Sequence, residues 1–530
     1  MTRTAAALLP LACLIAGGCS LEPRYERAPA PVTAGWPVGD AYLRRTETTL
    51  PALSYTDVFR DPKLQAVIAQ ALVNNRDLRI AAANVVSARA LYRVERSALF
   101  PQIDGTARAQ FGDNGSRGAS GLGQGIGTGG IGTGTGGIGP DGTGTGTGGV
   151  GTGNGTGVVT NGGGSGFYDQ YSVNAGISAF EIDLFGRIRS QSRAALATYF
   201  GTEAAARATR LSLVAEVASA YLTYGSDRSL LAIARATEAS AARSVTLTRA
   251  RLQGGIAPRT DLRQAETILF TARADTAALT TSLAQDVNAL TLLVGAPVDP
   301  TLLPASIESV DGLLAEVPAG LSSDILLRRP DVVQSEYDLR AANARIGAAR
   351  AALFPSISLT SIAGLASGAL GSLFSRGAFN WNASPTVTVP IFDGGANRGN
   401  LAYARAQQQL ALATYEQTIQ TAFREVSDAL ARRGTIDREL AARRDLTAAA
   451  QDNYYLSERS YRGGIGTFLN SLDAQRTLYS AQQQLVTTRL TRADNLVTLY
   501  RVLGGDALVA GNPAADPALR SPEPVPAAIR

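Results

Sequence analysis

The 530-residue chain contains no histidine, and it has only two cysteines, one methionine and two tryptophans. The missing histidine excludes a Ser-His-Asp triad, a Cys-His dyad and any histidine-ligated metal site. Lys63 is the only lysine, and the arginines that supply the net charge of +5 are interspersed with acidic residues rather than clustered. Such a distribution does not favour nucleic-acid binding. The composition therefore argues against histidine-dependent catalysis, a histidine-ligated metal site and nucleic-acid binding.

The N-terminus has the pattern of a secretory signal peptide over residues 1–18. Arg3 precedes an apolar run from Ala5 to Ala16 that is too short to span a bilayer as a permanent helix. The run Ile15-Ala16-Gly17-Gly18-Cys19 resembles a bacterial lipobox. That resemblance implies that Cys19 becomes the lipidated, palmitate-bearing N-terminus of the mature protein. An ordinary cleaved signal with an incidental cysteine is the alternative, because Ala16 lies where the motif usually has leucine.

The chain contains an internal duplication. Arg76–Pro101 resembles Pro330–Pro355 at an offset of 254 residues, and both segments end in Ala-Leu-Phe-Pro. Further along, Gly254-Gly255-Ile256 matches Gly463-Gly464-Ile465 at an offset of 209. We therefore predict two repeats, over residues 62–295 and 329–505, of which the first contains an insertion.

The insertion is a glycine tract. Residues 112–166 hold 27 of the 56 glycines and offer few apolar side chains, so burial cannot offset the loss of backbone entropy on folding. We expect a loop without a packed core, which by strand order lies on the extracellular side. The Pro- and Ala-rich tail, residues 506–530, is also predicted to lack a core.

Four segments alternate apolar and polar residues and predict strands, at about residues 102–111, 169–180, 356–364 and 381–391. Segments of this length with one apolar face fit transmembrane barrel strands, although half-buried soluble hairpins have the same pattern. Most of the remaining sequence predicts helices. Residues 187–253 and 396–462 contain no proline, and each predicts one very long helix with a coiled-coil seam. The shorter helices are expected at residues 62–99, 260–293, 331–353 and 468–503.

Several motifs resemble the outer-membrane factors of the TolC and OprM type, within the NodT-like lipoprotein subgroup. These motifs are CSLEPRYERAPAP at the start, the two ALFP strand entries, FEIDLFGRIR at Phe180–Arg189, VPIFDGGANR at Val389–Arg398 and YRGGIGTFLNSLDAQRTLYSAQQQL at Tyr461–Leu485. The resemblance implies a mainly α chain with membrane β-strands. Three chains would form a trimeric twelve-stranded β-barrel, four strands per chain, which continues into a long periplasmic α-helical coiled-coil barrel. A mixed equatorial domain would come from residues 19–61, residues 296–328 and the C-terminus.

The same resemblance implies an exit duct in the outer membrane of a Gram-negative bacterium. A homotrimer would conduct drugs or other small molecules outward, and it would catalyse no reaction and need no cofactor or metal. Its partners would be outer-membrane lipid, a periplasmic adaptor and an inner-membrane transporter of the RND type. A type I protein-secretion channel is the alternative within this class, and a surface adhesin or scaffold that displays the glycine loop is the alternative from another class.

Two sets of candidate site residues follow. Each long helix must reverse at a Gly-Gly turn, and the family resemblance implies that these turns contact the adaptor. The predicted contact residues are Arg251, Gly254, Gly255, Arg462, Gly463, Gly464 and Ile465. The resemblance also implies that Leu469 and Asp473, four residues apart on one helix face, line the periplasmic gate.

Overall fold

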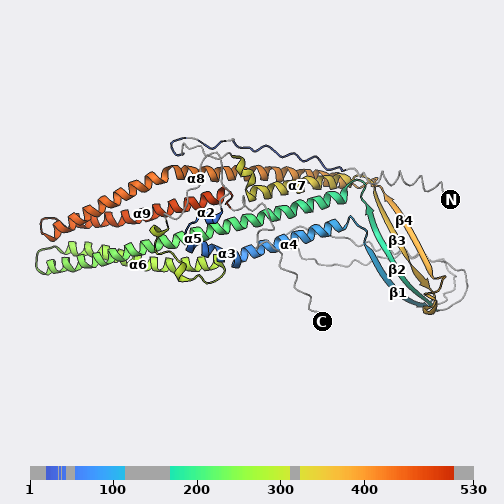
Figure 1. Ribbon diagram of the computed structural model, residues 1–530, viewed down its shortest axis with the longest axis horizontal. Helices are drawn as coiled ribbons and strands as arrows, with labels where there is room; N and C mark the ends of the chain where they lie inside the picture. Colours follow the sequence, from blue (N-terminus) through green and yellow to red (C-terminus); the bar gives the residue numbers. More distant parts are fainter. Residues whose placement is uncertain are drawn as a thin grey trace, which may run out of the picture. The chain divides into compact units, whose positions relative to one another are not determined.

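The computed structural model describes residues 20–33, 35–37, 39–42, 54–113, 167–310 and 323–505. The predicted signal peptide, Cys19, nearly all of the glycine tract and the C-terminal tail lie outside these residues. The chain divides into two compact units (Figure 1). Residues 101–180 and 358–386 contribute to a strand unit, and the rest of the described chain belongs to a helical unit.

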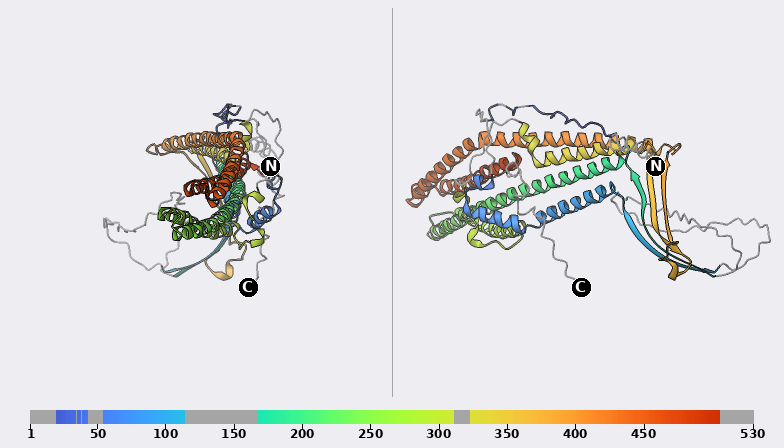
Figure 2. Two further views of the ribbon diagram at one scale, coloured as in Figure 1. Left: turned by 90° about the vertical axis from the view of Figure 1, so that its left-hand side faces the viewer. Right: turned by 45° about the vertical axis from the view of Figure 1, so that its right-hand side comes forward.

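Two helices of 67 residues dominate the helical unit, α5 (Arg187–Gln253) and α8 (Ala396–Arg462). Both have the bounds that the sequence predicts. Each turns back into a shorter helix, α6 (Arg259–Val294) or α9 (Phe468–Val502), and α7 (Pro330–Ala351) packs against both α5 and α8. The helices run side by side along the helical unit (Figures 1 and 2). A left-handed glycine precedes each long helix, at Gly186 and Gly395, which agrees with the duplication.

The helix predicted over residues 62–99 is in fact two helices. They are α3 (Pro62–Asn74) and α4 (Arg76–Ser97), and Asn75 between them has an extended backbone with a ψ of 140°. The Asn75 side chain accepts a hydrogen bond from the Leu78 amide and donates one to the Leu293 carbonyl. Asparagine is a strong helix N-cap, so it ends one helix and starts the next. The prediction of a single helix is wrong at this residue.

Short elements complete the helical unit. They are α2 (Tyr55–Val58) and the 3₁₀ turns Pro300–Leu302, Ile307–Ser309 and Ser323–Arg328. Among the described residues, no helix has an apolar stretch long enough to cross a bilayer.

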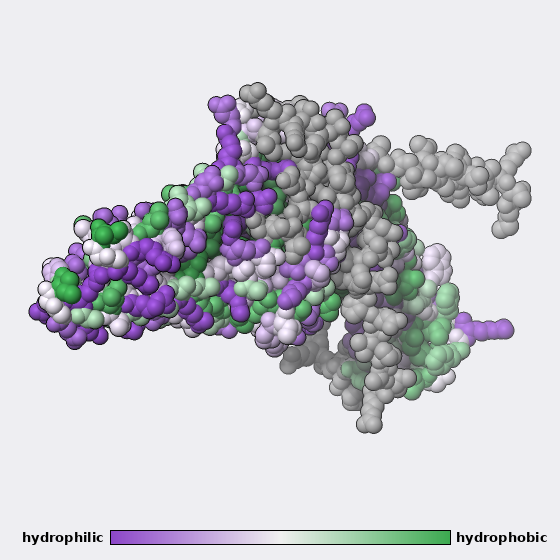
Figure 3. All heavy atoms as spheres, turned by 60° about the vertical axis from the view of Figure 1, so that its left-hand side comes forward, coloured by the Kyte–Doolittle hydropathy of each residue, from purple (hydrophilic) through white to green (hydrophobic). Residues whose placement is uncertain are grey.

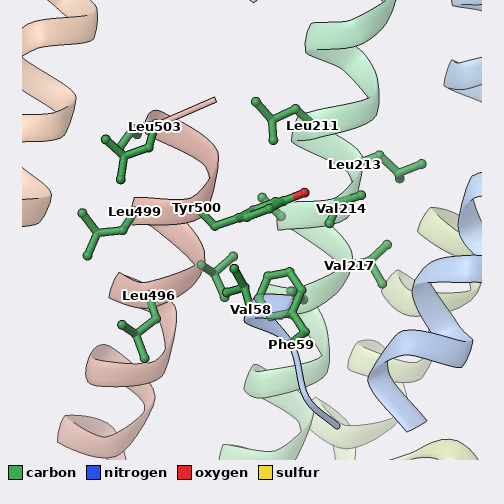
Figure 4. Packing of buried hydrophobic residues seen from close by; sticks show 14 of the residues in the cluster. Val58, Phe59, Leu211, Leu213, Val214, Val217, Leu496, Leu499, Tyr500 and Leu503 are labelled. Atoms are coloured by element: carbon green, nitrogen blue, oxygen red, sulfur yellow. The ribbon is translucent and has the colours of Figure 1, made fainter. Parts of the chain in front are cut away.

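The main hydrophobic core is built from residues of α2 and α3 and of the longer helices α5 to α9. Figure 4 shows part of it, with Phe59 directed between α5 and α9. Phe59 is fully buried, and its ring lies edge-on to Tyr500 with the ring centroids 5.3 Å apart. Leu211, Val214 and Leu222 of α5, which recur at helical spacing as a seam requires, are buried in the same cluster.

Because Phe59 is fully enclosed, we expect Phe59→Ala to lower the free energy of unfolding by about 3–5 kcal/mol. Phe270→Ala is the matched control, since Phe270 on α6 is 57% exposed. Thermal unfolding of the detergent-solubilised protein measures both changes. Equal destabilisation by the two variants would contradict this description of the core.

The carboxylates of Asp227 on α5 and Asp286 on α6 repel each other at the contact between these helices. Burial, and then the charge of Asp227, raise the pKa of Asp286 to about 6. One carboxylate oxygen of Asp286 is buried without a hydrogen-bond partner in the described chain. The unfolded chain has a pKa of about 3.9 at this residue, so the folded state binds the proton more tightly and loses stability as the pH rises through this interval.

We therefore expect Asp286→Asn to raise the midpoint of thermal unfolding at about pH 7.5 and to have little effect at about pH 4.5. Asp445→Asn, at an exposed position on α8, should change neither midpoint. A destabilising effect of Asp286→Asn at the higher pH would show that the carboxylate is needed in its charged form.

The strand unit is one antiparallel sheet with the order β1-β2-β3-β4. Its strands are β1 (Ile103–Asp113), β2 (Phe167–Ile182), β3 (Ser356–Ser367) and β4 (Phe379–Thr388). In the register of β1 and β2, Ala107 lies opposite Val173 and Ala109 opposite Tyr171. Opposed residues share a face of the sheet, so these apolar side chains of β1 and β2 lie on one face. The space-filling view shows much apolar surface on the strands, whereas the helical unit is mostly hydrophilic with isolated apolar patches (Figure 3).

The prediction for the fourth strand is wrong at its end. We expected residues 381–391, but β4 ends at Thr388. Pro390 follows two residues later, and proline cannot donate a ladder hydrogen bond. Val389 and Ile391 continue the alternating pattern of the sequence outside the strand.

Candidate functional site

The first predicted contact region is the turn that ends α5. The Ile256 amide donates to the Arg251 carbonyl at 2.8 Å, and the Gly255 amide donates to the Leu252 carbonyl at 3.0 Å. Gly255 has a φ of +72°. This pair of hydrogen bonds around a left-handed residue is a Schellman motif, which satisfies the last carbonyl groups of a helix.

The second turn, at the end of α8, has the same geometry. The Ile465 amide donates to the Ser460 carbonyl and the Gly464 amide to the Tyr461 carbonyl, both at 3.1 Å. Gly464 has a φ of +78°. The duplication is therefore preserved down to individual hydrogen bonds at both turns.

The two glycines of each pair have different roles. Only the second glycine, Gly255 or Gly464, has a positive φ. Gly254 and Gly463 have φ values of −79° and −73°, and a Cβ added at either would meet its neighbours only at ordinary contact distances. Backbone geometry therefore explains why glycine occupies positions 255 and 464. Nothing in the described part of the chain requires glycine at positions 254 and 463.

An isoleucine projects from each turn. Ile256 is 78% exposed and Ile465 is 86% exposed. Large apolar side chains with this exposure are candidates for an interaction surface when they recur at equivalent positions. The sequence-based list contains Ile465 but not Ile256. The offset of 209 that relates the two turns would have identified Ile256.

Arg251 connects the two turns. Its guanidinium lies 4.2 Å from the centre of the Tyr461 ring and donates to the carbonyl groups of Tyr461, at 3.0 Å, and of Arg462, at 3.4 Å. Tyr461 is buried and contacts the ring of Phe468. The residue equivalent to Arg251 in the second repeat is Ser460, so this connection exists in one direction only. Arg251 thus holds the ends of α5 and α8 together, whereas Arg462 forms an ion pair with Glu458 on its own helix.

Leu469 and Asp473 lie on the exposed face of α9, one turn apart. Leu469 is 60% exposed, and Asp473 is exposed and forms no ion pair within the described chain. The opposite face of the helix is buried through Phe468 and Leu472. The structure therefore places both predicted gate residues where neither contributes to the core of its own chain.

Comparisons with known proteins agree with this architecture. The sequence profile of the family described as outer membrane efflux protein matches residues 67–296 and 321–505. The chain is 43% identical over 499 residues to the probable efflux pump outer membrane protein TtgC of Pseudomonas putida, with 94% of each chain covered. It is 36% identical over 495 residues to outer membrane protein OprJ of Pseudomonas aeruginosa, with 93% of this chain and 94% of OprJ covered.

Solved structures show the same fold. The open-state MtrE outer membrane channel of Neisseria gonorrhoeae superposes with a TM-score of 0.75 at 32% identity, covering 92% of this chain and 99% of MtrE. CusC superposes with a TM-score of 0.74 at 33% identity, covering 92% of this chain and 100% of CusC. The family profile covers more than half of the chain, and the relatives match it over nearly its whole length. The chain therefore belongs to the outer membrane efflux protein family.

Proposed function

We propose that this chain forms the outer-membrane exit duct of a tripartite efflux pump, through which small molecules pass passively from the periplasmic side to the exterior. The chain is an outer-membrane protein of a Gram-negative bacterium that extends into the periplasm. The observation that carries the proposal is the pair of 67-residue helices that end in exposed turns with equivalent hydrogen bonds, in a chain whose relatives are outer-membrane proteins of efflux pumps. Helices of about 100 Å provide the length that a periplasmic duct needs.

We propose that three copies assemble. The sheet of one chain has four strands in the order β1-β2-β3-β4, so β1 and β4 are its edges. All residues of β4 are exposed. A sheet in lipid must close so that no edge is left unpaired. Two copies would give eight strands and a filled interior, whereas three would give twelve strands and room for a channel.

The two helix turns are the proposed contact with a periplasmic adaptor, which would link the duct to an inner-membrane transporter of the RND type. The exposed isoleucines and the glycines that have room for a Cβ support this assignment, because they offer an apolar surface that another backbone can approach closely. The proposed contact residues of the turns are Gly254, Gly255, Ile256, Gly463, Gly464 and Ile465. Arg251 would act mainly by holding the two turns in register.

Leu469 and Asp473 are the proposed gate. Three-fold symmetry would gather three Asp473 carboxylates into a ring, which would attract cations at the narrowest point of the duct. The exposure of both side chains supports the assignment, since a residue that lines a channel must be free of its own core.

The proposed cargo is small hydrophobic molecules. Relatives of this chain include a toluene efflux pump protein and an antibiotic efflux pump protein of Pseudomonas putida. Deletion of the gene should lower the tolerance of cells to toluene and to hydrophobic antibiotics and raise the accumulation of a fluorescent efflux substrate. Expression of the chain should restore both. Unchanged accumulation in the deletion strain, with no second outer-membrane factor expressed, would contradict the proposal.

A further inference from the structure

The first described residues of the chain, 20–33, 35–37 and 39–42, lie against the helical unit without forming a helix or a strand. We call them the strap. Its dark-blue trace follows α7 and α8 in both ribbon views (Figures 1 and 2). We infer that α7 and α8 carry a recognition site for this strap, that Glu336 is the residue that holds it, and that the site positions the N-terminal end of the mature chain.

The beginning of the strap is fixed by two arginines. Arg193 on α5 donates to the Ser20 hydroxyl at 2.9 Å and forms an ion pair with Glu22 at 2.7 Å. Arg350 at the end of α7 donates to the Leu21 carbonyl at 3.1 Å. The first three described residues are therefore each bound by a side chain of the helical unit.

Glu336 on α7 is the centre of the site. Its side chain is 6% exposed, and it pairs with Arg27 of the strap and with Arg340 one turn along its own helix. The Arg27 Nε atom lies 3.1 Å from one carboxylate oxygen, and a second guanidinium nitrogen binds the other oxygen. The Arg340 guanidinium also lies 5.0 Å from the centre of the Tyr25 ring. A buried carboxylate that takes a two-point contact from the strap is a specific anchor rather than a surface ion pair.

The far end of the strap fits the shape of α8. The Trp36 ring stacks on Phe423 with the centroids 5.0 Å apart. A Cβ added at Gly434 would lie 1.9 Å from the Ala41 carbonyl oxygen, and one added at Gly347 on α7 would lie 2.9 Å from Glu22. Glycine inside a helix costs about 1 kcal/mol relative to alanine. The close approach of the strap gives a reason for glycine at both positions.

The duplication offers a parallel. The residue that matches Gly434 at the offset of 209 is Gly225 on α5. A Cβ there would lie 3.4 Å from the Ile307 amide nitrogen, in the segment that connects the two repeats. Each long helix therefore carries a glycine at the place where a segment without α-helix crosses it. The strap occupies on α8 the position that the connecting segment occupies on α5.

If Cys19 is lipidated as proposed, the site also determines where the lipid lies. Cys19 directly precedes Ser20, and consecutive Cα atoms are about 3.8 Å apart. A lipid on Cys19 would therefore be held close to Arg193 and Arg350, at the start of α5 and the end of α7. A flexible tether would instead leave the helical unit free to move relative to its anchor.

Intrinsic fluorescence tests the site directly, because Trp36 and Trp381 are the only two tryptophans. In a Trp381→Phe background, Trp36 reports on the strap alone. We expect Glu336→Gln to shift the Trp36 emission to longer wavelength in the full-length protein in detergent. Loss of hydrogen bonds to a charged group should also raise the rate of tryptic cleavage after the exposed Arg24 by about tenfold or more.

The matched control is Glu238→Gln, which removes a carboxylate that pairs with Arg273 away from the strap. It should change neither the Trp36 emission nor the cleavage rate. Arg27→Ala provides a second test that leaves Glu336 paired with Arg340, and it should release the strap as well. If both Glu336→Gln and Arg27→Ala keep the emission and the cleavage rate of the parent protein, the inference is wrong.

The Cys19→Ser variant tests the binding of the strap independently of the proposed lipidation and of efflux. We expect the strap to remain bound in this variant, with unchanged Trp36 emission, because all of the contacts described come from residues after Cys19. A red-shifted emission in Cys19→Ser alone would show that the lipid, and not the site on α7 and α8, holds the strap. Neither result depends on whether the chain conducts drugs.

Discussion

Replacing Gly254 and Gly463 together by aspartate should abolish efflux-dependent drug tolerance while leaving the protein trimeric in the outer membrane. Both residues have right-handed helical φ values and room for a Cβ, so the substitutions strain neither turn. The two carboxylates would lie two residues before the exposed Ile256 and Ile465, at the proposed adaptor contact. Unpaired buried charge at an interface costs about 2–5 kcal/mol, which weakens binding at least about thirtyfold.

The choice of glycine matters for this experiment. Gly464→Asp also introduces charge, but Gly464 has a φ of +78°, so a loss of function there would mix altered turn geometry with altered docking. Gly399→Asp is the matched control, since Gly399 is an exposed helical glycine on α8 with no atom within 4 Å of an added Cβ. The control should retain tolerance. Full tolerance in the Gly254→Asp, Gly463→Asp double variant would refute the adaptor contact at the turns.

The second large effect is expected at the gate. Asp473→Ala, alone or with Leu469→Ala, should raise the single-channel conductance severalfold and reduce the preference for cations in planar bilayers. The substitutions remove the proposed carboxylate ring and the apolar side chain one turn before it. Since both residues are exposed and outside the core, the fold should be unaffected.

Two variants separate charge from size and position. Asp473→Asn keeps the shape of the side chain and should reduce cation preference with a smaller change in conductance. Gln264→Ala is the control, because Gln264 occupies the equivalent exposed position in the first repeat and carries no charge. If Gln264→Ala and Asp473→Ala have the same effect on ion selectivity, Asp473 is not the gate carboxylate.

The sequence predicts the helical unit well because its signals are local. Glycine pairs follow both 67-residue helices, and left-handed glycines precede them, so both ends of α5 and α8 are marked in the sequence. The break at Asn75 was not predicted, since asparagine in an otherwise helical pattern gives no strong signal without its partner, the Leu293 carbonyl. The end of β4 was misplaced because the apolar alternation of the sequence continues through Val389 and Ile391, beyond the last strand residue, Thr388.

The strap could not be predicted from local pattern. Residues 20–42 have neither a helical nor a strand period, and Glu336 lies 309 residues from Arg27. The contact that Arg251 makes between the two turns is also invisible to local pattern, since its partners Tyr461 and Arg462 are about 210 residues away. Contacts of this kind depend on the tertiary arrangement of the helices. The sequence predicts both turns. The different roles of their paired glycines follow only from the φ angles in the structure, which are positive for Gly255 and Gly464.

The most direct test of the central claim is ion conduction by the purified full-length protein in planar bilayers. The account predicts discrete, cation-preferring channels formed by a trimer, with a conductance that increases in the Asp473→Ala, Leu469→Ala double variant. The absence of channel activity from both the wild-type protein and the double variant, with trimers verified in the same preparation, would contradict the assignment as an exit duct.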